Sequence, residues 1–179
     1  MNSALLVIDV QNDVVIHAHD RDVVIATIQD LVLRARSKDV PVIWVQHADD
    51  ELVVDTDGWK FVSELVPAPG EAIVHKHLRN GFEQTTLASE LAAKSIERLI
   101  ITGAQTDFCV RWTLHGALDR GFDTVLVSDG HTTDDPTDPQ MPSARALIAH
   151  TNAVWEHATA PTCTASVASA HDVSLRLDE

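Results

Sequence analysis

Cysteine is scarce in this chain of 179 residues, which holds only Cys109 and Cys163. Two cysteines are too few for the disulfide framework of a small secreted protein, so we expect a cytoplasmic protein with reduced thiols. A basic, apolar leader is also missing, because Met1 to Ala4 run directly into the first apolar segment. No apolar run approaches the ~20 residues that a membrane-spanning helix needs. The sequence therefore predicts neither a secretory signal nor a membrane anchor.

Basic residues are few as well. Lysine and arginine number 13 against 27 aspartates and glutamates, which gives a formal net charge of −14. A chain this acidic repels phosphate backbones and anionic lipid surfaces. We therefore expect neither nucleic acid nor a membrane as a partner, and the natural ligand is a small molecule.

Apolar residues make up 45% of the chain, which is enough for a folded core, and no repeat, linker or low-complexity segment interrupts it. Short apolar runs typical of buried strands alternate with segments of helical spacing. Strands are predicted at 3–8, 41–45, 72–74, 98–102, 123–127 and 162–167, and helices at 21–38, 59–65, 85–95, 110–118 and 143–156. This alternation predicts a single α/β domain over residues 1–179. Its architecture is three-layer α/β/α, with a mostly parallel, six-stranded, open sheet of the Rossmann-like kind.

Cys109 lies where the fourth predicted strand gives way to a helix. The first turn of a helix offers unpaired N–H groups and a partial positive charge. Both favour a thiolate, so a cysteine at this position can have a lowered pKa and act as a nucleophile. The same N–H groups can hold an oxyanion. A small buried core residue is the alternative for Cys109, and it is the interpretation we give to Cys163.

Asp9, Lys76 and Cys109 each come directly after a predicted strand, and parallel strands would bring all three to one edge of the sheet. These residue types suit cysteine hydrolysis. Cys109 would attack a carbonyl carbon, Asp9 would take the thiol proton and pass it to the leaving amine, and Lys76 would hold Asp9 and stabilise negative charge. Individually, an aspartate here is often a loop cap and a lysine is usually solvated. Ten histidines leave a Cys–His pair as another option.

Several separated motifs occur together from about Ala4 to His157. They are Val7–Asp13, Val45–His47, Lys76 with Phe82, Thr85 and Leu87, Gly103–Val110 with Thr113, Ala117 and Gly121, Ser128–Thr133, and Ile148–Asn152. With these motifs the chain resembles the isochorismatase-like cysteine hydrolases, a family that includes nicotinamidases. The resemblance implies a central parallel sheet and a catalytic triad that falls on Asp9, Lys76 and Cys109. It also implies a cis peptide bond between Ala104 and Gln105, with the N–H groups of Gln105 and Cys109 as the oxyanion hole.

Departures from the family pattern narrow the expected activity. Isochorismatases proper act without the nucleophilic cysteine, so Cys109 favours hydrolysis of the C–N bond of a small-molecule amide through a thioester. Nicotinamidases carry an Asp-x-His metal-ligand motif after the second strand, whereas this chain has His47 alone in the segment Gln46–Glu51. We therefore expect no metal, no other cofactor and a main activity other than nicotinamide hydrolysis.

Four further residues are candidates for the substrate pocket. Gln11 lies two residues past Asp9, and His47 either lines the pocket or supports it. Trp59 and Phe82 are candidates for apolar walls, with packing in the core or at a subunit interface as the alternative. The loops 48–59 and 77–82 are expected to set the shape of the pocket.

Two other functions and one assembly state complete the expectations. The same triad suits hydrolysis of another acyl or imide bond, and a non-catalytic family scaffold is the remaining alternative. Members of the family commonly form homo-oligomers. We expect a dimer or larger assembly here, with Trp112 and Trp155 as candidates for its interface.

Overall fold

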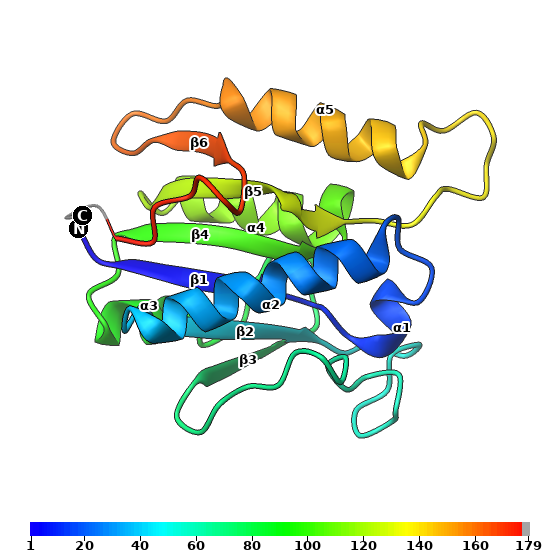
Figure 1. Cartoon of the computed structure of the whole chain (residues 1–179), viewed down its shortest axis with the longest axis horizontal. Helices are drawn as coiled ribbons and strands as arrows, with labels where there is room; N and C mark the ends of the chain where they lie inside the picture. The colour runs from blue at the N-terminus through cyan, green and yellow to red at the C-terminus, as the bar shows by residue number, and fades with distance from the viewer. Residues whose placement is uncertain (177–179) are drawn as a thin grey trace.

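The computed structural model describes residues 1–176. Among these residues six strands form one sheet in the order β3-β2-β1-β4-β5-β6 (Figure 1). The strands are β1 (Ser3–Ile8), β2 (Val42–His47), β3 (Ala72–Lys76), β4 (Arg98–Ala104), β5 (Asp123–Thr132) and β6 (Ala165–Ala168). Every neighbouring pair is parallel, so the expected α/β fold is confirmed and its sheet is parallel throughout.

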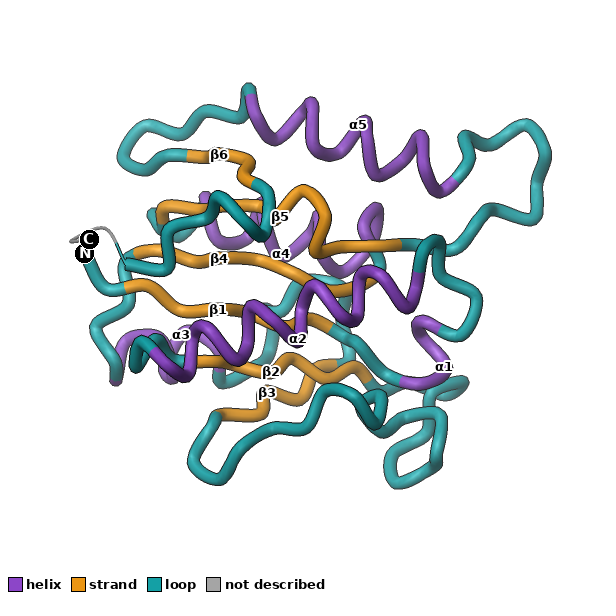
Figure 2. The backbone as a smooth tube through the Cα atoms, in the orientation of Figure 1, coloured by secondary structure: helices purple, strands orange, loops and turns teal. Residues whose placement is uncertain are grey.

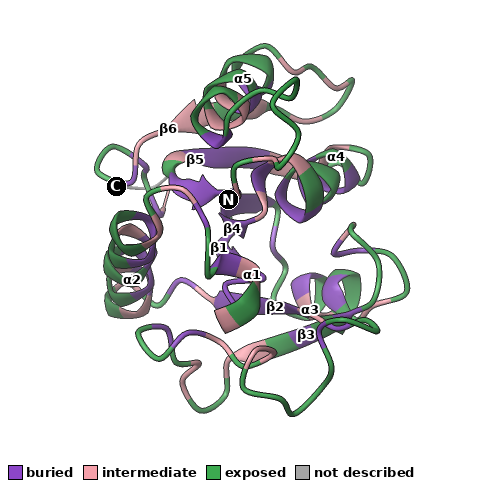
Figure 3. Cartoon of the chain, turned by 90° about the vertical axis from the view of Figure 1, so that its right-hand side faces the viewer, coloured by how far each residue is buried: buried purple, intermediate pink, exposed green. Residues whose placement is uncertain are grey.

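Helices cover both faces of the sheet, which makes three layers. They are α1 (Asn12–Val15), α2 (Arg21–Ser37), α3 (Leu87–Ala93), the π-helix η1 (Thr106–Val110), α4 (Arg111–Leu118) and α5 (Ala144–Glu156). Helix α2 lies on one face, and α3, α4 and α5 lie on the other (Figure 3). None of these helices, within the described part of the chain, is long and apolar enough to cross a membrane.

The core consists of two apolar clusters separated by the sheet. Successive residues of a strand point to opposite faces. Leu5 and Val7 of β1 therefore pack under α2, whereas Leu6 and Ile8 pack under the helices of the other face. All residues of β1 and β4 are buried, as the continuous apolar runs predicted.

The segment 59–65 differs from its prediction, because it forms turns instead of a helix. It belongs to the long loop that runs from the carboxyl end of β2 to the start of β3 (Figure 2). Phe61 makes an isolated antiparallel bridge with Gln11, and the Val62 N–H donates to the Val10 carbonyl. Pairing with the chain after β1 thus replaces the hydrogen bonds that a helix would have made.

Trp155 also differs from its expectation as an interface residue. Its side chain is buried within the chain and packs edge-on against His115, with ring centroids 5.3 Å apart. Trp112 remains half-exposed. The homo-oligomer stays a prediction.

Candidate active site

Asp9, Lys76 and Cys109 meet at the carboxyl edge of the sheet. Asp9 follows β1 directly, Lys76 ends β3, and Cys109 lies in η1 just after β4. The order 3-2-1-4-5-6 reverses between β1 and β4, and open α/β sheets have their ligand crevice at such a switch point. The topology therefore places two of the three side chains on either side of the crevice and brings the third from the edge strand.

The three side chains are in direct contact. The Lys76 Nζ atom lies 2.7 Å from Asp9 Oδ2 and 3.2 Å from Cys109 Sγ. The side chains of Lys76 and Asp9 are 0% and 2% exposed, so this is a buried ion pair and Lys76 is not a solvated surface residue. Burying two charges costs several kcal/mol unless they are paired. The contact between them is therefore essential to the site.

The backbone at this edge needs glycine. Gly103 has a φ of +120°, and a Cβ there would lie 2.0 Å from the carbonyl oxygen of Ile8. Only glycine lets β4 approach the end of β1 this closely. The register of β4 against β5 shifts between Ile101 and Gly103. One residue beyond Gly103, the peptide bond between Ala104 and Gln105 is cis. The family resemblance implies a cis bond at this same place.

Burial raises the pKa of the Cys109 thiol to about 12. The negative charge of Asp9 raises it too, while the Lys76 ammonium lowers it. The lowering that a helix start can produce is therefore outweighed at Cys109. The reason is that Cys109 is the fourth residue of η1, buried, and beside a carboxylate. With this pKa, Cys109 is a thiol at neutral pH.

His47 extends this chain of polar contacts outward. Its Nδ1 lies 3.2 Å from Lys76 Nζ, and its Nε2 lies 3.0 Å from Asp49 Oδ2. A lysine ammonium can only donate, so Nδ1 accepts and Nε2 carries the proton that Asp49 accepts. The backbone N–H of Leu52 and then the His47 ring hold the pKa of Asp49 below its usual range. His47 thus fixes the direction of the Lys76 side chain.

Gln11 connects the strand ends and does not line the cleft. It is fully buried, and its Nε2 donates to the carbonyls of His47 and Trp59 at 2.9 and 2.7 Å. Its Oε1 accepts from the His47 N–H at 2.8 Å. All of these partners belong to the protein, so the side chain ties the end of β1 to β2 and the following loop.

Trp59 and Phe82 also lie outside the cleft. Trp59 stacks on His75, with ring centroids 5.8 Å apart. Phe82 is buried in the core against Phe122. Of the four pocket candidates, only His47 lines the cleft.

The cleft above Cys109 has a volume of about 630 Å³. Asp9, His47 and Gln105 line it, as expected from the sequence, together with residues that sequence reasoning missed. The missed residues are Asp13, Val14, Asp49, Glu51, Leu52, His77, Leu78, Arg79 and Phe108. Several of these belong to the loops 48–59 and 77–82 that we expected to shape the pocket. Asp13 and Phe108 lie inside the motifs Val7–Asp13 and Gly103–Val110, so these motifs could have indicated both residues.

A buried hydrogen-bond chain holds the loop that carries Cys109. The Oγ1 atom of Thr106, in η1, lies 2.8 Å from His131 Nδ1, and His131 Nε2 lies 2.9 Å from Asn152 Oδ1. The Asn152 amide group donates to the Ser128 carbonyl at 3.0 Å, which orients its oxygen toward His131. His131 therefore donates from Nε2 and accepts the Thr106 hydroxyl proton at Nδ1. Strand β5 and helix α5 thus position the start of η1.

Metal binding finds little support in the arrangement of side chains. Across residues 1–176, no three histidine, cysteine, aspartate or glutamate side chains gather in a way that could hold a metal ion. The expectation of a metal-free site stays a prediction.

Comparison with known proteins matches the chain to one family. The family model for the isochorismatase domain matches residues 3–159. A streptothricin hydrolase from Streptomyces noursei is 35% identical over 138 residues, which are 74% of this chain and 55% of that protein. The chain spans about half the length of the curated relatives it matches.

Solved structures show the same fold. An isochorismatase from Pseudomonas putida KT2440 is 24% identical, with a TM-score of 0.88 over 97% of this chain and 90% of that one. An isochorismatase-like hydrolase from Alkaliphilus metalliredigens is 25% identical, with a TM-score of 0.79 over 96% of both chains.

Proposed function

The chain belongs to the isochorismatase family, and from this premise we propose that it is a hydrolase that cleaves the C–N bond of a small-molecule amide. The observation that carries the proposal is the placement of Lys76 Nζ, which touches both Asp9 Oδ2 and Cys109 Sγ, and Asp9 and Cys109 both line the cleft. The streptothricin hydrolase to which this chain is similar is itself named as a hydrolase. A nucleophilic cysteine further supports a thioester route.

The proposed first half of the reaction forms the thioester. The Cys109 sulfur attacks the carbonyl carbon while its proton passes to Asp9, which is necessary because the resting thiol has a pKa of about 12. The N–H groups of Gln105 and Cys109 hold the oxyanion that develops. When the C–N bond breaks, Asp9 returns the proton to the leaving amine.

The second half releases the acid. A water molecule attacks the thioester carbon and gives a proton to Asp9, and the C–S bond then breaks. The departing Cys109 sulfur takes that proton, which restores the thiol and the carboxylate. Lys76 stays paired with Asp9 and offsets the negative charge that moves between oxygen and sulfur.

The proposal is tested with a panel of small amides and with the variants Cys109→Ala and Cys163→Ala. We expect Cys109→Ala to lower turnover by roughly 10⁴-fold or more, and Cys163→Ala, which alters the thiol outside the cleft, to leave turnover unchanged. Acid quenching during turnover followed by mass spectrometry should show an acyl group on the peptide that holds Cys109.

Three results would contradict the proposal. Turnover that survives in Cys109→Ala would remove the cysteine from the mechanism. Turnover of esters or imides without any amide would move the activity to another acyl bond, and no turnover at all would favour a non-catalytic scaffold.

A further inference from the structure

The cleft carries carboxylates that the proposed mechanism does not use. Asp13, Asp49 and Glu51 line it together with Asp9, whereas Arg79 is the only lysine or arginine among the described lining residues. Asp49 already accepts hydrogen bonds from His47 and from two backbone N–H groups. The carboxylates of Asp13 and Glu51 have no hydrogen bond or ion pair within residues 1–176. Two unpaired negative charges therefore belong to the lining of the cleft, and the Asp13 carboxylate packs against Gly58.

A buried carboxylate beside the Cys109 thiol lies deeper. Asp9 is 1% exposed, and its Oδ1 atom has no hydrogen-bond partner among the described residues, while its Oδ2 atom pairs with Lys76. A buried carboxylate oxygen normally finds a donor, and its absence is costly. Since Asp9 lines the cleft, a ligand that brings N–H donors would satisfy this oxygen.

An aromatic face completes the surroundings. Phe108 lines the cleft beside Cys109, and the Arg79 Cζ atom lies 3.9 Å from the centroid of its ring. The ring thus already holds one planar cation against its face. An aromatic face next to free carboxylates is the set of groups that binds ammonium and guanidinium ions.

We propose that Asp13, Glu51 and Phe108 select a cationic substrate, one with a protonated amine or a guanidinium near the amide to be cleaved. In this proposal the substrate cation lies near the two carboxylates and the Phe108 ring, whose other face Arg79 occupies, and the scissile carbonyl group faces Cys109. This inference rests on the proposed function, because a preference for cations selects a substrate only if the site cleaves amides. In the opposite assignment, Arg79 would bind an anionic substrate. The two unpaired carboxylates would repel that substrate, and Arg79 is the only lysine or arginine among the described lining residues.

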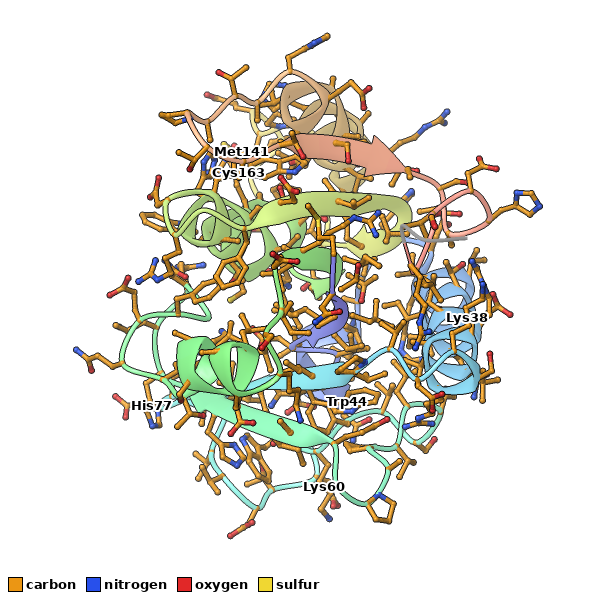
Figure 4. The ribbon with its side chains drawn as sticks, turned by 90° about the vertical axis from the view of Figure 1, so that its left-hand side faces the viewer. Lys38, Trp44, Lys60, His77, Met141 and Cys163 are labelled. Atoms are coloured by element: carbon orange, nitrogen blue, oxygen red, sulfur yellow. The ribbon has the colours of Figure 1, made fainter. Side chains whose placement is uncertain are left out.

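The first experiment measures charge selection at the cleft without turnover. Thiosulfonate reagents of matched size, one with a trimethylammonium group and one with a sulfonate group, are reacted with the native protein, and modification is followed by mass spectrometry at each cysteine. Cys163 serves as the internal reference, because it lies near the β6 edge of the sheet, whereas His77 of the cleft follows β3 at the other edge (Figure 4). We expect the ratio of cationic to anionic rates at Cys109 to exceed the ratio at Cys163 by about fivefold or more.

Variants then assign the selection to named residues. Asp13→Asn combined with Glu51→Gln should reduce the rate ratio at Cys109 to near that at Cys163, and Glu51→Gln alone should reduce it in part. The matched control is Asp50→Asn, because Asp50 is exposed beside Glu51 but does not line the cleft. It should leave the ratio at Cys109 unchanged. Equal ratios at the two cysteines, faster anionic modification of Cys109, or a ratio that ignores the double substitution would overturn the inference.

The second experiment compares amides that differ only in a cationic, neutral or anionic substituent. We expect the highest kcat/KM for the cationic amide, and a selective loss of that advantage in the double variant. Turnover without a charge preference would contradict this inference and leave the proposed function intact. Charge selection at Cys109 without turnover of any amide would contradict the proposed function and leave the cation preference standing.

Discussion

At the scale of the residue, Lys76 contacts both partners of the proposed proton transfer. It pairs with Asp9, the proposed proton acceptor, and it lowers the pKa of Cys109, the proposed proton donor. Burial and the Asp9 charge outweigh that effect, so the thiol stays protonated at rest. The three residues could be located from the sequence because parallel strands end at one edge of the sheet. The sequence could not give the direction of the pKa change, which depends on burial depth and on distances of a few ångströms.

Asp9→Asn and Lys76→Met should therefore shift the Cys109 pKa in opposite directions. Removing the Asp9 charge lowers the pKa from about 12, and removing the Lys76 ammonium raises it further. Alkylation of Cys109 by iodoacetamide between pH 7 and 10, followed by mass spectrometry, should be faster in Asp9→Asn and slower in Lys76→Met than in the native protein. Amide hydrolysis should be lost in both.

Cys163 is the control for this prediction, and its rate of modification should not change. Circular dichroism verifies folding, which matters for both variants because each leaves one partner of the buried ion pair without the other. Asp9→Asn alone tests the direction. Slower alkylation in Asp9→Asn would mean that Asp9 already holds the Cys109 proton at rest.

At the scale of the element, β5 and α5 decide where η1 begins. Their residues His131 and Asn152 reach Thr106 through buried hydrogen bonds, and they lie 25 and 46 positions beyond it in the chain. The sequence predicted β5 only to residue 127, because the polar residues after it are typical of a loop. The strand continues to Thr132 by pairing with Gly103 and Ala104 of β4. Long-range pairing of this kind leaves no local sequence signal.

His131 should make the protein less stable in mild acid. Burial lowers its pKa in the folded protein, while in the unfolded chain it titrates near ~6.5. The unfolded state then binds more protons below that pH, so the free energy of unfolding falls as the pH drops from about 7 to 5. The stability difference between native protein and His131→Gln should shrink over this window, by at most about 1.4 kcal/mol per pH unit.

Urea unfolding at several pH values measures this difference, in which the common effects of other titrating groups cancel. His150→Gln, on the exposed side of α5, is the control variant. A difference between native protein and His131→Gln that stays constant from pH 7 to 5 would show that His131 does not carry the acid sensitivity.

At the scale of the whole molecule, the two apolar clusters lie on opposite faces of the sheet and share its strands. Both clusters draw residues from β1 and β4, so neither can lose its packing without exposing the other side of the same strands. The sequence predicted this arrangement well, because continuous apolar runs indicate strands buried on both faces. It did not predict which loop residues line the cleft, since Phe82 turns into the core and Phe108 turns out of it.

A single domain should therefore unfold in one cooperative transition. Trp44 lies in the cluster under α2, and Trp155 lies in the cluster on the other face. Two variants are made in a background with Trp59→Phe and Trp112→Phe. Adding Trp155→Phe leaves Trp44 as the single fluorescent reporter, and adding Trp44→Phe leaves Trp155. For each variant, we expect the urea midpoint from tryptophan fluorescence to coincide with the midpoint from far-UV circular dichroism. Each comparison is made within one variant, so the stability cost of the substitutions does not affect it.

The element most able to separate is α5 with β6, because β6 pairs only with β5 among the described strands. A Trp155 transition at lower urea than the dichroism transition would show that this end of the sheet unfolds by itself, and the single-domain prediction would be wrong.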